Sequence, residues 1–141
     1  MPTRELLTRA IIVQNNNILL CKNIKNPAHS YYFLPGGHVE QGESPEKALE
    51  REVHEEIGRE ILAIKKIVEF ENVFEEDGKT YDEYTYVYLT TLKDYKNIEG
   101  LEGHLAFEWI PLNIVMNIDF KPEEARANII KSIEENIEFW S

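Results

Sequence analysis

One amphipathic run, residues 37–59, constrains this chain more than any other feature (GHVEQGESPEKALEREVHEEIGR). Ser44 and Pro45 suit the N-cap and the first position of a helix, because serine accepts a free backbone N–H and proline lacks one. Gly58 suits the helix end. The apolar residues between these boundaries recur every four positions and predict a buried stripe: Leu49, Val53 and Ile57.

The same helix places Glu52, Glu55 and Glu56 on another face, because they are separated by three and four residues. Like charges at this spacing repel one another, and a bound cation would relieve that repulsion. Carboxylate oxygens suit hard cations such as Mg²⁺ or Mn²⁺, and none of the three residues is a Cys or His that would favour zinc. An alternative is an ordinary solvated acidic face.

A pair of glycines precedes this helix. Residues 34–40 predict a strand that breaks at Gly36 and Gly37 and then resumes. Glycine lets the backbone approach a ligand closely and present a carbonyl to it. Glu43 lies in the loop that feeds the helix, where it can join the acidic cluster. Arg51 has an exposed alternative as the i+4 partner of Glu55.

The spacing of these residues resembles the Nudix box, G-x5-E-x7-R-E-U-x-E-E-x-G-U, where U is aliphatic. The sequence departs from the box at its last position, which is Arg59, and Ile61 is the next apolar residue. The resemblance implies one domain over residues 1–141 with an α+β fold, an α/β/α sandwich with a mixed β-sheet between helices. Its order of strands, helix, strands and helix agrees with this expectation.

The resemblance also implies an enzyme that needs Mg²⁺ or Mn²⁺ and cleaves a nucleoside diphosphate linked to another moiety. Nucleoside triphosphates, nucleotide sugars and ADP-ribose all remain open as substrate classes. The carbonyl of Gly36 and the carboxylates of Glu52, Glu55 and Glu56 would hold the metal. Glu52 is the first choice for the general base, Glu43 would assist, and Arg51 would orient the glutamates. The alternative is a non-catalytic Nudix domain that senses a nucleotide or binds a partner.

Further site residues are expected outside the box. Glu102, in the loop 100–104, is a candidate metal ligand, with a solvated loop carboxylate as the alternative. Lys22 would contact phosphate, while His29 and Tyr32 would line the substrate pocket. Each also has an ordinary structural interpretation, as a solvated or packed side chain. Tyr84, Tyr86 and Tyr88 alternate along a predicted strand, where sheet packing is favoured over base stacking.

Composition limits the remaining function classes. The formal charge is −11, from 26 acidic and 15 basic residues, which disfavours stable nucleic-acid binding and makes a polyanionic substrate dependent on metal. Cys21 is the only cysteine and predicts a buried thiol in a reducing compartment. The N-terminal sequence lacks the apolar region of a signal peptide, and no apolar stretch reaches transmembrane length. We therefore expect a cytoplasmic protein without a membrane partner, for which a homodimer remains an open arrangement.

The rest of the chain predicts strands at residues 6–13, 18–22, 31–34, 61–73, 80–92 and 106–110. Turns are expected at residues 15–17 and 76–78. A terminal helix is expected over residues 122–139, where apolar residues recur every four positions: Ala125, Ile129, Ile133 and Ile137.

Overall fold

The computed structural model describes residues 3–140, which form two β-sheets and two α-helices. The first sheet has the order β4-β1-β6-β5, with β1 parallel to β6 and the other pairs antiparallel. The second sheet is antiparallel with the order β2-β3-β7. The strands are β1 (Arg4–Ile11), β2 (Val13–Gln14), β3 (Asn17–Asn23), β4 (Gly36–His38), β5 (Ile61–Glu76), β6 (Lys79–Leu92) and β7 (Leu105–Pro111).

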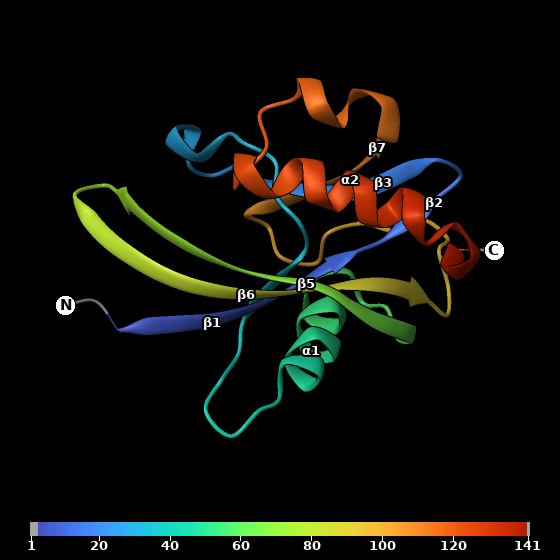
Figure 1. Ribbon diagram of the computed structural model, residues 1–141, viewed down its shortest axis with the longest axis horizontal. Helices are drawn as coiled ribbons and strands as arrows, with labels where there is room; N and C mark the ends of the chain where they lie inside the picture. The colour runs from blue at the N-terminus through green and yellow to red at the C-terminus, as the bar shows by residue number, and fades with distance from the viewer. Residues whose placement is uncertain (1–2, 141) are drawn as a thin grey trace.

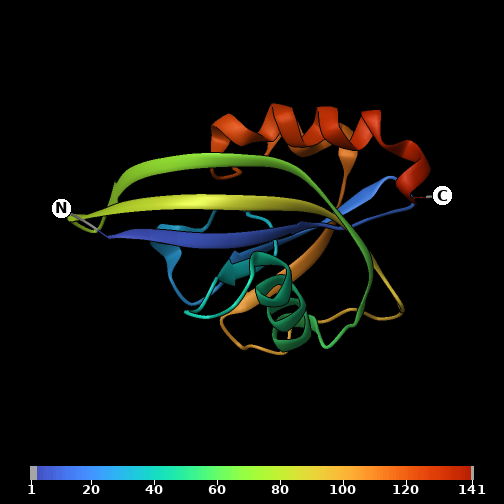
Figure 2. The same ribbon diagram turned by 60° about the horizontal axis from the view of Figure 1, so that its bottom comes forward.

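Helices α1 (Pro45–Ile57) and α2 (Arg126–Glu135) cover opposite faces of the larger sheet (Figures 1 and 2). This arrangement confirms the predicted α/β/α sandwich, although the strands divide into two sheets. Four short 3-10 helices complete the described secondary structure: η1 (Pro27–His29), η2 (Leu112–Asn117), η3 (Glu123–Ala125) and η4 (Ile137–Trp140).

Strand alternation supplies a hydrophobic core on each side of the sheet. Successive side chains of a strand point to opposite faces. In β1, Ala10 packs toward α1 and Ile11 toward α2, and in β6 Tyr88 faces α1 while Val87 faces α2. Tyr88 is therefore a packing residue, as the strand pattern favours, and its hydroxyl donates a hydrogen bond to the Glu46 carboxylate.

Helix α1 forms as its sequence predicts. The Ser44 hydroxyl accepts a hydrogen bond from the Lys47 backbone N–H at 3.1 Å, and Pro45 occupies the first helical position. Gly58 ends the helix in the left-handed conformation (φ 66°), which glycine adopts without steric cost. The predicted stripe is buried: Leu49, Val53 and Ile57.

The predicted strand at residues 31–34 is wrong. Tyr32 and Phe33 form only isolated bridges, to Phe120 and Cys21, and the strand that follows instead contains both glycines. Pro35 has no N–H to donate to a neighbouring strand, so regular pairing with β1 begins at Gly36. The two glycines thus form the strand rather than interrupt it.

The terminal helix is shorter than predicted. Its α-helical part ends at Glu135, and Asn136 leaves helical geometry (φ −126°, ψ 37°). Ile129 and Ile133 are buried, but Ile137 is 65% exposed, because the four-residue repeat no longer follows the helix. Trp140 instead packs against the core beneath α2, together with Phe139.

The β5–β6 hairpin extends well beyond the helices (Figure 1). Its turn residues Asp77 and Gly78 both have positive φ, as do Asn15 and Asn16 between β2 and β3, which confirms both predicted turns. β5 is longer than predicted. Lys65 and Lys66 both pair with β6, and the register shift between Lys66 and Val68 leaves Ile67 as the bulged residue. The hairpin provides one long wall of the pocket described below.

The two isoleucines of the terminal segment allow a direct test of this core. Ile133→Ala should lower the free energy of unfolding by about 2–5 kcal/mol, because Ile133 is 4% exposed and its removal leaves a cavity. Ile137→Ala should change it by less than about 0.5 kcal/mol, because that side chain is exposed. Urea unfolding of both variants measures the difference, and equal losses would contradict the described end of α2.

Candidate metal centre and adjoining pocket

Three glutamates of α1 lie at the edge of the sheet next to β4. Glu56 is 4% exposed, and its Oε1 accepts a hydrogen bond from the Gly36 backbone N–H at 3.1 Å. The Glu52 side chain is 15% exposed and that of Glu55 is 49% exposed. The helix therefore presents two largely buried carboxylates and one in contact with solvent.

The absence of side chains at Gly36 and Gly37 allows this close approach. A Cβ atom on Gly36, which has φ 140°, would lie 2.0 Å from the Thr8 carbonyl oxygen. A Cβ atom on Gly37 would lie 2.6 Å from the Glu52 carboxyl carbon. Real Cβ contacts are longer than this, so the glycine pair lets β4 pack against β1 on one side and lets Glu52 lie against it on the other.

Arg51 joins the carboxylates into one network. Its Nε and Nη2 donate to the two oxygens of Glu43 at 2.8 and 3.0 Å. Its Nη1 donates to Glu52 at 2.9 Å and to Glu55 at 3.3 Å, and Nη2 also donates to the His38 carbonyl oxygen. The guanidinium therefore fixes the loop before the helix, strand β4 and two glutamates at once.

This network gives the glutamates different proton affinities. Hydrogen bonds from Arg51 lower the pKa of Glu43 to about 2, so its carboxylate is a poor proton acceptor at neutral pH. Burial raises the pKa of Glu52 and raises that of Glu56 to about 8, and the Glu102 charge adds to both shifts. Glu52 and Glu56 are therefore the two carboxylates for which a positive charge nearby would be most favourable.

Glu102 reaches this region because its loop packs on the end of α1. The Leu101 backbone N–H donates to the Glu56 carbonyl oxygen at 2.7 Å, and the Leu101 side chain lies over the position of Gly58. The neighbouring Glu102 is partly buried, and its charge acts on both Glu52 and Glu56. The structure therefore brings the predicted loop carboxylate to the box glutamates.

The donor set fits a hard divalent cation. It consists of oxygen atoms alone, and Mg²⁺ and Mn²⁺ prefer carboxylate, carbonyl and water oxygens. The carboxylate oxygens of Glu52, Glu55 and Glu56 do not all lie within 4.8 Å of one another. Glu52 and Glu55 accept hydrogen bonds from Arg51, and Glu56 accepts one from the Gly36 N–H. Among residues 3–140, a group whose potential ligand atoms do lie within 4.8 Å of one another is Glu5, His38 and Glu83.

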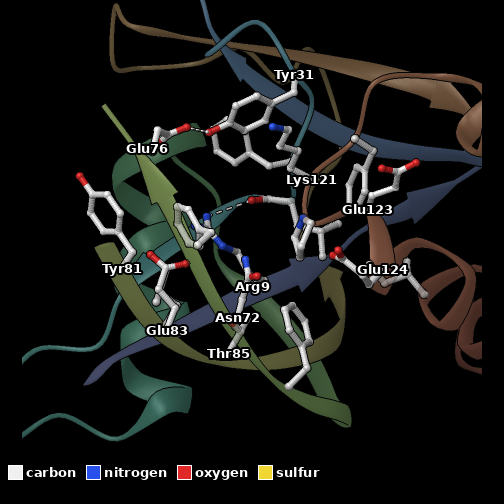
Figure 3. A pocket seen from close by; sticks show the side chains of 18 of the residues that line it. Arg9, Tyr31, Asn72, Glu76, Tyr81, Glu83, Thr85, Lys121, Glu123 and Glu124 are labelled. Atoms are coloured by element: carbon white, nitrogen blue, oxygen red, sulfur yellow. Dashed lines mark hydrogen bonds between the residues drawn. The ribbon is translucent and has the colours of Figure 1, made fainter. Parts of the chain in front are cut away.

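A cavity of about 500 Å³ includes Arg9 and Leu34 in its wall, and the charge of Arg9 acts on Glu56 of the metal centre. The β5–β6 hairpin forms one wall, and the segment around Tyr31 and the segment before α2 form the other (Figure 3). Arg9 connects the two sites, because it lines the cavity and donates to the Leu34 carbonyl oxygen at 3.1 Å. Burial raises the pKa of both Glu56 and Glu83, and the charge of Arg9 partly offsets that rise.

Two of the three residues predicted for substrate binding, Lys22 and Tyr32, contact each other outside this cavity. The Lys22 ammonium lies 4.8 Å from the centre of the Tyr32 ring, and the Tyr32 hydroxyl donates to Glu108 at 2.6 Å. Neither Lys22 nor Tyr32 lines the cavity. The side chain of His29 lies outside the described part of the structure.

Sequence reasoning missed the residues that do line the cavity, among them Arg9, Tyr31, Asn72, Glu83 and Lys121. They come from five separate segments of the chain, so no local motif marks them. Strand alternation supplies one signal, because Arg9 on β1 and Glu83 on β6 fall on the same face of the sheet as Ile11 and Val87, which pack toward α2.

Arg59, which replaces the last aliphatic residue of the box, caps the helix instead. Its guanidinium donates to the Ile57 carbonyl at 3.4 Å and also to the Lys96 carbonyl. A cation is favourable at a helix C-terminus, where carbonyl groups lack partners. Ile61 packs against the core beneath α1, so it supplies the apolar contact that Arg59 does not.

Comparison with known proteins agrees with this geometry. The family model described as NUDIX domain matches residues 5–132. The chain belongs to the NUDIX family. This membership confirms the resemblance seen in the sequence and the fold expected from it.

The NUDIX chain is similar to several characterised proteins. It is 50% identical over 48 residues to an ADP-ribose pyrophosphatase of Methanocaldococcus jannaschii, a match that spans 34% of this chain and 28% of the relative. A MutT NUDIX hydrolase from Burkholderia pseudomallei superposes with a TM-score of 0.74 at 23% identity, over 93% of this chain and 98% of that one.

The NUDIX domain of Shewanella oneidensis NrtR, solved with ADP ribose, also has a TM-score of 0.74, at 17% identity over 97% of this chain and 90% of that chain. At these identities the two structures establish the fold. Within residues 3–140, no helix combines the length and apolar character needed to cross a membrane.

The Arg51–Glu43 pair predicts a pH dependence of stability. The folded pKa of Glu43, about 2, lies below its ordinary value of 4.5, so the pair stabilises the fold fully above about pH 4.5 and loses that contribution as the pH falls toward 2. The difference in Tm between the wild type and Glu43→Gln should therefore shrink as the pH is lowered from about 6 to about 3.

Thermal unfolding followed by circular dichroism measures this difference. Glu50→Gln, on the exposed face of the same helix, controls for the loss of one carboxylate. A difference in Tm between the wild type and Glu43→Gln that stays constant over this pH range would contradict the pairing.

Proposed function

We propose that this chain is a divalent-metal-dependent pyrophosphohydrolase. Its substrate is a nucleoside diphosphate linked to another moiety, from the nucleoside triphosphate, nucleotide sugar or ADP-ribose class. The observation that carries the proposal is a pair of carboxylates placed against a glycine strand and near a cavity: Glu56, which is buried, and Glu52, whose side chain is 15% exposed. Membership of the NUDIX family and the similarity to an ADP-ribose pyrophosphatase support it.

In this proposal Glu52, Glu55, Glu56 and the Gly36 carbonyl hold Mg²⁺ or Mn²⁺, and Glu102 is a further candidate ligand. The cation would neutralise phosphate oxygens, which otherwise repel an attacking water. The chain itself is strongly acidic, so a polyanionic substrate needs this compensation. Arg9, at the junction of metal centre and cavity, offers the substrate a second positive charge.

Glu52 is the proposed general base. It is largely buried, and Arg51 fixes its orientation by a hydrogen bond to one carboxylate oxygen. Glu43 has a different role, because its carboxylate is held by two N–H groups of Arg51 and has a lowered pKa. It positions Arg51, and through Arg51 it positions Glu52.

The proposed function first predicts that hydrolysis depends on a divalent metal ion. Purified protein should hydrolyse at least one of the three substrate classes with Mg²⁺ or Mn²⁺, and EDTA should abolish the reaction because the carboxylates alone repel the substrate. A phosphate-release assay measures the rate before and after chelation. Hydrolysis that continues in EDTA would contradict the metal assignment, whereas a folded protein inactive on the whole panel would favour a non-catalytic nucleotide sensor.

The role of Glu52 predicts a selective loss of turnover. Glu52→Gln should lower kcat by about 10²–10⁴-fold, because the amide keeps the shape of the side chain but cannot accept the proton. Glu50→Gln, two residues earlier on the exposed face, should leave kcat within about twofold. Steady-state kinetics compares the two variants, and an unchanged kcat in Glu52→Gln would move the base to another residue.

A further inference from the structure

We propose that the cavity beside the metal centre receives a nucleobase that carries an amino group, and that Glu83 accepts a hydrogen bond from that amino group. The inference rests on the proposed function, because it assigns the non-phosphate half of the same substrate. Four observations carry it: the place of the cavity, its aromatic walls, its excess of carboxylates and the position of Glu83.

The cavity has the size and place for a nucleoside. Its volume of about 500 Å³ lies within the usual range for small-molecule sites, about 300–1,000 Å³. Leu34 and Arg9 belong to its wall, and Gly36, two residues beyond Leu34, contacts Glu56 of the metal centre. A substrate whose diphosphate lies at the glutamates therefore has its other half directed into this cavity.

Aromatic side chains form much of the wall. Phe33, Phe70, Phe74 and Tyr81 line it, and Phe74 and Tyr81 are stacked at 5.1 Å with an interplanar angle of 14°. The Tyr31 hydroxyl donates to Glu76 at 3.3 Å and links the opposite wall to the end of the hairpin (Figure 3). Flat π surfaces favour a planar aromatic group over a sugar.

The charge of the cavity disfavours a phosphate within it. Among the residues that line it, the cations are Arg9, which lies at the junction with the metal centre, and Lys121, which lies over the Tyr31 ring at 5.0 Å. The carboxylates lining the cavity outnumber them: Glu75, Glu76, Glu83, Glu123 and Glu124. A ligand that donates hydrogen bonds matches this lining, because a carboxylate only accepts them.

Glu83 is the carboxylate placed to accept a hydrogen bond from such a donor. It is partly buried on β6, next along the cavity face from Thr85, and its charge interacts with that of Arg9 (Figure 3). Glu5 and His38 lie beside it and hydrogen-bond to each other at 2.7 Å on the exposed rim. Asn72 lies beside Glu83, because the two residues are paired in the register of β5 with β6, and its side-chain amide can both donate and accept.

Pairs of nucleotides whose bases differ by one amino group test this assignment without catalysis. Isothermal titration at pH 7.5 compares GMP with IMP, and AMP with purine riboside 5′-monophosphate, each against the purified protein. In the wild type the amino-bearing member of each pair should bind at least about fivefold more tightly, because a hydrogen bond to a charged acceptor is strong. In Glu83→Gln this preference should fall below about twofold.

Two further variants separate selectivity from affinity. Phe74→Leu should weaken all four nucleotides by about threefold to tenfold and keep the amino preference, because stacking does not distinguish these bases. Glu134→Gln removes an exposed carboxylate from α2, outside the cavity, and should change neither quantity.

Equal binding within both pairs, or a preference that survives in Glu83→Gln, would overturn the proposal. Ribose 5-phosphate bound as tightly as the nucleotides, or no nucleotide bound at millimolar concentration, would overturn it as well. These results leave the proposed function standing if hydrolysis still depends on metal and Glu52. Conversely, an amino preference in a protein without hydrolysis would contradict only the proposed function.

Discussion

The close packing of helix α1 against the glycine strand β4 is the constraint on which the rest of the site depends. Gly37 leaves room for the Glu52 carboxyl, and the Gly36 N–H holds Glu56 in the sheet edge. Two carboxylates thereby lose much of their hydration, which is unfavourable in free energy unless a nearby positive charge or hydrogen bonds offset it. The helix cap at Ser44 and the apolar stripe of α1 fix the helix in this place.

Arg51 supplies part of the positive charge that these carboxylates need, and it fixes the orientation of the groups around it. Its planar guanidinium serves Glu43, Glu52 and Glu55 together with a backbone carbonyl, which a lysine ammonium could not match in geometry. One positive charge does not balance this group of carboxylates, and Glu102 adds a further negative charge. We therefore infer that a divalent cation supplies the remaining positive charge. The same cation would also neutralise a phosphate-rich substrate.

The sequence predicted the parts of this arrangement that depend on local spacing. The limits of α1, its buried stripe, the grouping of its glutamates and both hairpin turns follow from residues a few positions apart. The cavity could not be predicted in this way, because Arg9, Asn72, Glu83 and Lys121 meet only through strand register and the docking of α2. Lys22 and Tyr32 were predicted from their positions in the sequence alone. In the structure the Lys22 ammonium lies over the Tyr32 ring, and neither residue lines the cavity.

The central claim is that Glu52 and Glu56 together form a divalent cation site. Titration of Mn²⁺ followed by electron paramagnetic resonance at pH 7.5 tests it without any substrate. The account predicts that the wild type binds Mn²⁺ and that Glu56→Gln weakens this binding by at least about tenfold, while Glu50→Gln does not. Equal Mn²⁺ affinity in the wild type and a folded Glu56→Gln variant would contradict the claim.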